Sequence, residues 1–157
     1  MSSPISSTHA TTHFVRDHCV CLHLQRAARS LARRFDEAFR PLELTNGQFS
    51  ILMSLNRPEP PPMGSVADLL AMDRTTLTAA LKPLERRGLV RIAQNKIDRR
   101  SRNLILTANG RALLVRAAPI WKQTHAEIEE RLSSSKLDDL LKSLLALSSS
   151  TCTSRPK

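Results

Sequence analysis

Apolar residues recur at helical spacing through most of the chain. Between Phe14 and Phe39 they return every three or four residues, which predicts one long amphipathic helix that ends before Pro41. Further helical patterns occupy the segments 45–55, 65–71, 73–88, 107–132 and 136–147. The segments 89–94 and 102–106 are short and are the clearest strand patterns. The pattern therefore predicts a mainly α fold with one two-stranded hairpin.

The segment 73–110 carries the clearest sequence of elements. Asp73 is a favourable N-cap, Leu77, Leu81 and Leu84 form one apolar face, and Gly88 suits a helix end. A polar, cationic tip separates the two predicted strands, and a short helix precedes the long one across a turn at 71–73. Helix, turn, helix and basic hairpin together indicate a winged helix-turn-helix domain, with the second helix placed for the major groove.

Charge supports a nucleic-acid partner. The chain carries a net charge of +10, and the segment 74–102 alone holds nine Lys or Arg residues against two acids. Such a local excess is the footprint expected for phosphates, although a merely solvated basic face is the alternative. The candidate DNA-binding residues are Arg74, Thr75, Thr76, Thr78, Ala79, Lys82 and Arg86 on the helix and Lys96, Arg99 and Arg100 on the hairpin tip. Thr75 and Thr76 are equally explained as capping residues, and Asp98 is expected to fix the tip by pairing with an arginine or a backbone amide.

A family resemblance rests on several motifs of this region. The segment DRRS at 98–101, followed by LILTANG at 104–110, resembles the wing of the MarR family of bacterial transcription regulators. The segments 44–52 and 77–90 also match that pattern, and the resemblance spans about 21–132. It implies a dimeric, sequence-specific DNA-binding regulator, most often a repressor, that binds a pseudo-palindromic operator and is released by a small organic effector. A basic architectural protein without sequence preference is the alternative outside this class.

The two ends of the chain predict how the domain is completed. Residues 1–12 and 148–157 are polar and are expected to be flexible tails. The helical regions 13–44 and 107–147 flank the DNA-binding domain at 45–106 and carry apolar stripes that need a partner. A homodimer formed through these N- and C-terminal helices is therefore expected.

Candidate switch residues lie in the flanking helices and in the helix that Thr45 caps. The resemblance implies an effector cleft, for which the candidates are His23, Arg26, Phe49, Met53 and Trp121. It also places Cys21 where the peroxide-sensing branch carries a reactive cysteine, but the tyrosines of that branch are absent here. A packing cysteine is the alternative. Cys19 and His23 have zinc-compatible spacing, yet no acidic residue accompanies them, so no metal site is predicted.

Several function classes are not expected. The chain lacks a long apolar run, a secretory signal pattern and a disulfide spacing of its three cysteines, which favours a cytoplasmic protein without a membrane partner. Glycine-rich phosphate loops and catalytic serine or zinc motifs are also missing from the sequence. An enzymatic activity and a cofactor are therefore not predicted.

Overall fold

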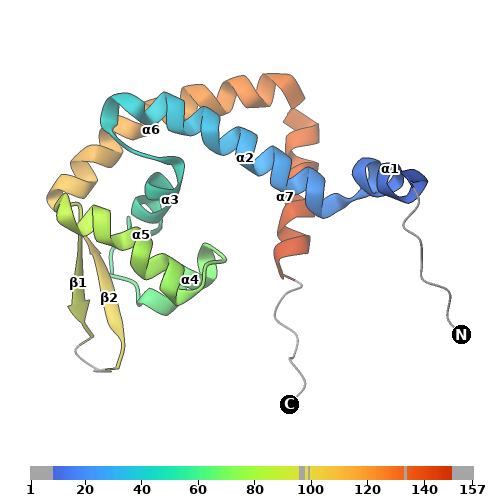
Figure 1. Ribbon diagram of the computed structural model, residues 1–157. Coiled ribbons are helices and arrows are strands. Elements are labelled where there is room, and N and C mark those ends of the chain that lie inside the picture. Colours follow the sequence, from blue (N-terminus) through green and yellow to red (C-terminus); the bar gives the residue numbers. More distant parts are fainter. Residues whose placement is uncertain (1–8, 96–97, 99, 133, 150–157) are drawn as a thin grey trace, which may run out of the picture.

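Two long helices run side by side above a small domain that ends in a projecting β-hairpin (Figure 1). The computed structural model describes residues 9–95, 98, 100–132 and 134–149, without the side chains of 134, 135 and 149. The elements in chain order are α1 (His9–His18), α2 (Val20–Phe39), the 3-10 helix η1 (Arg40–Leu42), α3 (Asn46–Ser54), α4 (Met63–Leu69), α5 (Arg74–Arg86), β1 (Val90–Gln94), β2 (Arg102–Leu106), α6 (Ala108–Leu132) and α7 (Ser134–Ser149). The mainly α fold with a two-stranded wing is therefore confirmed.

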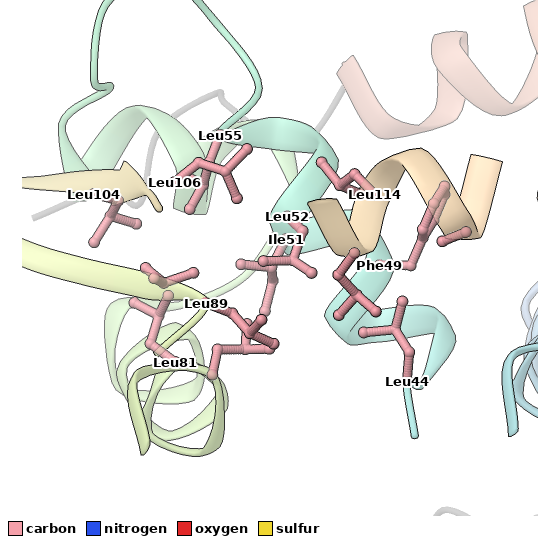
Figure 2. Packing of buried hydrophobic residues seen from close by; sticks show 14 of the residues in the cluster. Leu44, Phe49, Ile51, Leu52, Leu55, Leu81, Leu89, Leu104, Leu106 and Leu114 are labelled. Carbon is pink, nitrogen blue, oxygen red and sulfur yellow. The ribbon is translucent and has the colours of Figure 1, made fainter. Parts of the chain in front are cut away.

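The hydrophobic core joins the winged domain to the ends of the two long helices (Figure 2). Phe39 at the end of α2 is fully buried and stacks on Phe49 of α3, with ring centroids 4.8 Å apart. Leu77, Leu81 and Leu84 of α5 are also fully buried, as their spacing predicts. The opposite face of α5 is therefore left for solvent or a ligand.

The hairpin is antiparallel, with Val90 opposite Leu106 and Gln94 opposite Arg102. The proline-rich connector between α3 and α4 pairs with β2. Pro62 forms a bridge with Asn103, and the amide of Leu104 donates to the carbonyl oxygen of Pro61 at 2.9 Å. Proline can occupy such an edge position because only its carbonyl group is needed there.

The N-terminal helix differs from the prediction. It begins at His9, so part of the expected tail 1–12 is helical, and it breaks at Cys19, where the backbone is extended (φ −73°, ψ 105°). The Sγ of Cys19 accepts a hydrogen bond from the amide of Leu22 at 3.4 Å and caps α2. The single helix over Phe14–Phe39 is therefore wrong, because a local side-chain cap replaces the continuous backbone ladder.

Two further boundaries are corrected. α4 begins at Met63 rather than Ser65. α7 extends to Ser149, so the first two residues of the expected tail 148–157 are helical. Met53 is 45% exposed, because α3 turns Ile51 and Ser54 inward instead.

The turn between α4 and α5 has an unusual residue at its centre. Ala71 is left-handed at φ 51°, and the amide of Met72 donates to the carbonyl oxygen of Ala67 at 2.9 Å. This is the hydrogen bond of a Schellman C-cap, in which glycine is the usual left-handed residue. The turn thus places α5 directly after α4, in the helix-turn-helix order.

Candidate nucleic-acid interface

The start of α5 is fixed by its N-cap. The carboxylate of Asp73 accepts from the amide of Thr76 at 2.8 Å and from the hydroxyl of Thr76 at 2.6 Å. The hydroxyl bond of Thr76 is the largest cause that lowers the pKa of Asp73. Thr76 is therefore engaged in capping, which favours the capping interpretation for this residue.

One face of α5 is exposed over its first two turns. Arg74, Thr75, Thr78, Ala79 and Lys82 line a shallow hollow on that face. The hydroxyl of Thr78 donates to the carbonyl oxygen of Arg74 at 2.7 Å, so its oxygen keeps its lone pairs as acceptors. Arg86 is exposed near the end of the same helix. The helix-face candidates other than Thr76 are thus presented together.

The wing is built from side-chain bonds to its own backbone. Asp98 accepts from the amide of Arg100 at 3.0 Å, and the amide of Asp98 donates to the side-chain oxygen of Asn95 at 3.1 Å. The expectation that Asp98 holds the tip through a backbone amide is confirmed. Two candidates of the tip, Lys96 and Arg99, lie outside the described residues.

A cleft of about 480 Å³ separates α5 from the wing. Its lining residues are Met63, Gly64, Arg74, Thr78, Ile92, Asp98, Arg100, Ser101 and Arg102. Arg74 from the helix and Arg100 from the wing therefore face one cleft, although they are 26 positions apart in the chain. Arg102, which belongs to the basic segment but is not among the candidate DNA-binding residues, also lines the cleft. Asp98 is the acidic side chain of the lining.

Gly64 explains how Arg74 fits beside α4. A Cβ added at Gly64 would lie 3.4 Å from the Nη2 of Arg74, so the guanidinium passes close over the glycine. A larger side chain there would compete with the guanidinium for space. No signal in the sequence links these two residues, because the contact depends on how α4 packs against α5.

The effector candidates fall into two groups. Phe49, Met53 and Trp121 line a mainly apolar hollow of about 560 Å³ between α3, α4 and α6. Lys122 and the exposed Leu69 complete its rim, and neither belongs to the predicted set. His23 and Arg26 lie exposed on the first half of α2 and do not line this hollow. The five residues therefore do not line one cleft within the chain. The first half of α2, called the α2 arm below, extends away from the hollow.

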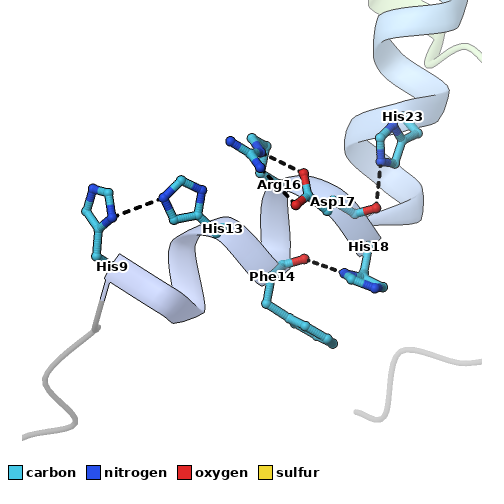
Figure 3. Close-up of polar contacts among 7 residues, drawn as sticks. All are labelled: His9, His13, Phe14, Arg16, Asp17, His18 and His23. Carbon is cyan, nitrogen blue, oxygen red and sulfur yellow. Dashed lines mark hydrogen bonds and ion pairs between the residues drawn. The ribbon is translucent and has the colours of Figure 1, made fainter.

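The histidines near the N-terminus form local hydrogen bonds (Figure 3). His18 bonds to the carbonyl oxygen of Phe14 at 2.9 Å, and His23 bonds to that of Asp17 at 3.2 Å. Cys21 is exposed, and its Sγ accepts from the side-chain amide of Gln25 at 3.3 Å. Across the described residues, no three His, Cys, Asp or Glu side chains are grouped to hold a metal ion.

None of the helices formed by the described residues has the length and apolar character needed to cross a bilayer.

A helix-turn-helix with an attached basic wing defines a class of winged-helix DNA-binding proteins. Comparison with known proteins identifies the family within this class. The model described as "MarR family" matches residues 44–101. The HTH-type transcriptional regulator TtmR of Methylorubrum extorquens (strain PA1) is 33% identical over 97 residues, or 62% of this chain, and the match covers 50% of TtmR. The matched part of the chain thus spans about half the length of this curated relative.

Two solved relatives match over nearly their full length. The transcriptional regulator MosR of M. tuberculosis, in complex with DNA, is 36% identical with a TM-score of 0.76, covering 84% of this chain and 95% of MosR. The transcriptional repressor CouR, bound to a 23-mer DNA duplex, is 31% identical with a TM-score of 0.75, covering 85% and 94%. A second CouR structure, bound to p-coumaroyl-CoA, is 29% identical with a TM-score of 0.72, covering 82% and 90%.

The chain belongs to the MarR family of transcriptional regulators. Members of this family are DNA-binding regulators and not enzymes. The family assignment follows from the winged-helix geometry together with relatives that match over most of both chains.

Proposed function

We propose that the protein is a repressor that binds a pseudo-palindromic DNA operator as a homodimer and is released by a small organic molecule. The observation that carries the proposal is the exposed face of α5 beside the wing, where Arg74 and Arg100 face one cleft. MosR and CouR, which share the fold and about a third of the sequence, have both been solved with DNA.

Arg74 is the proposed base-reading residue. It stands at the first position of α5, where a recognition helix meets base edges, and a guanidinium can bind guanine O6 and N7 together. Thr75, Thr78 and Ala79 supply hydroxyl and methyl groups next to it, while Lys82 and Arg86 suit phosphates further along the helix. On the wing, Arg100 is proposed to contact the minor groove, with Lys96 and Arg99 as further candidates.

The DNA proposal is tested by selecting duplexes from a random pool with the purified protein. We expect one pseudo-palindrome whose half-site centres lie about 10 base pairs apart. Arg74→Ala should weaken binding by about 1–3 kcal/mol and relax preference at one position of each half-site. Arg100→Ala should weaken binding to all sequences alike. It should also reduce the slope of log affinity against log salt concentration by about 1. Arg116→Ala removes the same charge from an exposed position of α6 and serves as the control. Equal competition by unrelated DNA would instead favour an architectural protein.

An aromatic carboxylic acid or its thioester is the proposed effector. The hollow between α3, α4 and α6 is mainly apolar, with Phe49 and Trp121 in its wall and Lys122 at its rim. An apolar wall with one cation suits a planar ligand that carries an anionic group. CouR, a relative with the same fold, binds p-coumaroyl-CoA, which combines these two features.

Trp121 provides a direct assay because it is the one tryptophan of the chain. We expect p-coumarate or p-coumaroyl-CoA to change its fluorescence at concentrations that also release DNA. Lys122→Ala should weaken binding of the acid but leave binding of the matching neutral alcohol unchanged. If the fluorescence responds while DNA remains bound, the hollow binds the ligand but is not the switch, because a ligand shifts an equilibrium only through differential affinity.

A further inference from the structure

Arg87 links the end of the recognition helix to a distant part of the backbone. It is the C-cap residue of α5, and its side chain reaches residues that lie 44 and 45 positions earlier in the chain. Nη1 donates to the carbonyl oxygen of Glu43 at 2.5 Å, and Nη2 donates to that of Leu42 at 3.2 Å. The planar guanidinium thus binds two consecutive carbonyl groups at once, which a lysine ammonium cannot do with the same geometry.

The two carbonyl groups belong to the junction between α2 and α3. There the chain leaves α2 through η1, and Glu43 ends η1 in a left-handed conformation (φ 50°, ψ 41°). The amide of Glu43 donates back to the carbonyl oxygen of Arg40 at 2.9 Å, so the turn is tight. A cation at this place is favourable because the C-terminal ends of both α5 and η1 carry partial negative charge.

Contacts at this junction fix the direction in which the α2 arm extends from the winged domain. On one side, Phe39 is fully buried and packs on Phe49, which anchors the end of α2 in the core. On the other side, Arg87 fastens the following turn to the end of α5. The end of α2 is therefore anchored to α3 through Phe39, and the turn that follows it is anchored to the end of α5 through Arg87, whose exposed side chain alone provides both hydrogen bonds.

We propose that Arg87 is a positioning residue for operator recognition, which fixes the angle between α2 and α5 and so sets the spacing of the two recognition helices in the dimer. This inference rests on the proposed dimeric binding to a two-half-site operator. It does not require Arg87 to touch DNA. Its guanidinium contributes to the positive charge of the basic segment 74–102, but it binds backbone carbonyl groups of the protein itself.

The test compares Arg87→Gln and Arg87→Lys with the wild type on three duplexes. One is the duplex selected by the wild-type protein, and the others have one base pair added or removed between the half-sites. Arg86→Ala is the matched control, because it removes a charge from the neighbouring exposed position of the same helix. Thermal melting followed by circular dichroism establishes that each variant is folded.

We expect the wild type to bind the duplex with the selected spacing most tightly. In both Arg87 variants the ratio of affinities between this duplex and the altered ones should fall about tenfold, while the salt dependence of binding stays unchanged. Arg87→Lys is informative because it keeps the charge but not the two-carbonyl fork. Arg86→Ala should keep the spacing preference and lower the salt slope by about 1.

Three results would overturn the proposal. An Arg87→Gln protein that keeps the full spacing preference, or that loses affinity evenly with a smaller salt slope, is incompatible with a positioning role. An Arg87→Lys protein that behaves as the wild type would show that charge alone matters. A wild type without any spacing preference would overturn the two-half-site function itself, and the role of Arg87 with it, so the two failures are distinguishable.

Discussion

The carboxylate of Asp73 ties the stability of the recognition helix to pH. Its hydrogen bonds with the hydroxyl and amide of Thr76 lower its pKa in the folded state. A group whose folded pKa is depressed contributes stability above its unfolded pKa, and this contribution is lost as the pH falls through the folded value. The cap should therefore be fully effective at neutral pH and fail in acid.

Asp73→Ala should lower the melting temperature at neutral pH and flatten its dependence on pH in the acid range. The physical reason is that the variant removes both the acceptor of Thr76 and the titrating group. Melting curves followed by circular dichroism between neutral pH and pH ~3 measure this effect. Asp68→Ala, an exposed acid on α4, is the control. An equal acid dependence in the wild type and Asp73→Ala would contradict the assigned role.

Cys21 allows ligand release and oxidation to be separated. A redox switch needs a thiolate, which nearby cations favour. In the part of the chain described, the neighbour bonded to its Sγ is the uncharged amide of Gln25, and His18 is turned to the carbonyl oxygen of Phe14. We therefore expect organic hydroperoxide to leave the DNA complex intact and Cys21→Ser to bind DNA normally in a mobility-shift assay. Release by hydroperoxide in the wild type but not in Cys21→Ser would make oxidation the switch.

At the scale of elements, the packing of α6 against the start of the wing depends on Gly110. A Cβ added there would lie 2.3 Å from the carbonyl oxygen of Leu89 and 2.6 Å from the Cδ1 of Leu106. The same carbonyl accepts from the amide and the hydroxyl of Thr107, so it cannot shift without breaking these two hydrogen bonds with the residue that precedes α6. The wing and α6 are therefore held in one fixed arrangement at this point.

Gly110→Ala should destabilise the protein by about 1–3 kcal/mol, as overpacked sites do. Gly47→Ala is a matched control on α3, because a Cβ at Gly47 meets nothing within 4 Å. The control should be stabilised by about 0.5–1 kcal/mol, since alanine is favoured over glycine in a helix. Urea unfolding of the two variants measures both effects, and a neutral Gly110→Ala would mean that the two elements can separate without cost.

Elements whose limits are set by neighbouring residues could be predicted from the sequence. The residues that set such limits are Asp73, Gly88 at φ 66°, Thr107 and the capping box of Thr45 and Gln48. Each acts within a few positions of its own helix end. The break at Cys19 and the bridge from Pro62 to Asn103 could not be predicted in the same way. The first depends on a thiol cap that is rare for a helix, and the second requires a partner 41 positions away.

The candidate site shows the same division. Periodicity identifies the exposed face of α5, because the buried leucines determine where the other side chains point. It does not identify Lys122 at the rim of the hollow or Arg87 at the α2–α3 junction, since both roles depend on elements that are distant in the chain. The family resemblance groups His23 and Arg26 with Phe49, although in the structure they lie on the exposed first half of α2 and do not line the hollow that Phe49 lines.

At the scale of the whole molecule, the apolar surface that remains exposed lies mainly at the two ends of the chain. Phe14, Val15 and Val20 of the N-terminal helices are each more than half exposed. Leu141 and Leu145 of α7 are 47% and 66% exposed, while Leu137 at the start of that helix is buried. A soluble monomer rarely leaves apolar side chains grouped in this way, which favours coverage by a second copy of the chain.

The double variant Leu141→Glu, Leu145→Glu should therefore dissociate the proposed homodimer. Two carboxylates on the surface that becomes buried would have to be desolvated without partners. Sedimentation velocity at micromolar concentration should show a dimer for the wild type and a monomer for the variant, and the monomer should lose its affinity for the two-half-site duplex. Leu69→Glu makes the same change at an exposed leucine of the winged domain and should remain dimeric. A wild type that sediments as a stable folded monomer, or a double variant that remains dimeric, would show that the α7 leucines are not the dimer interface.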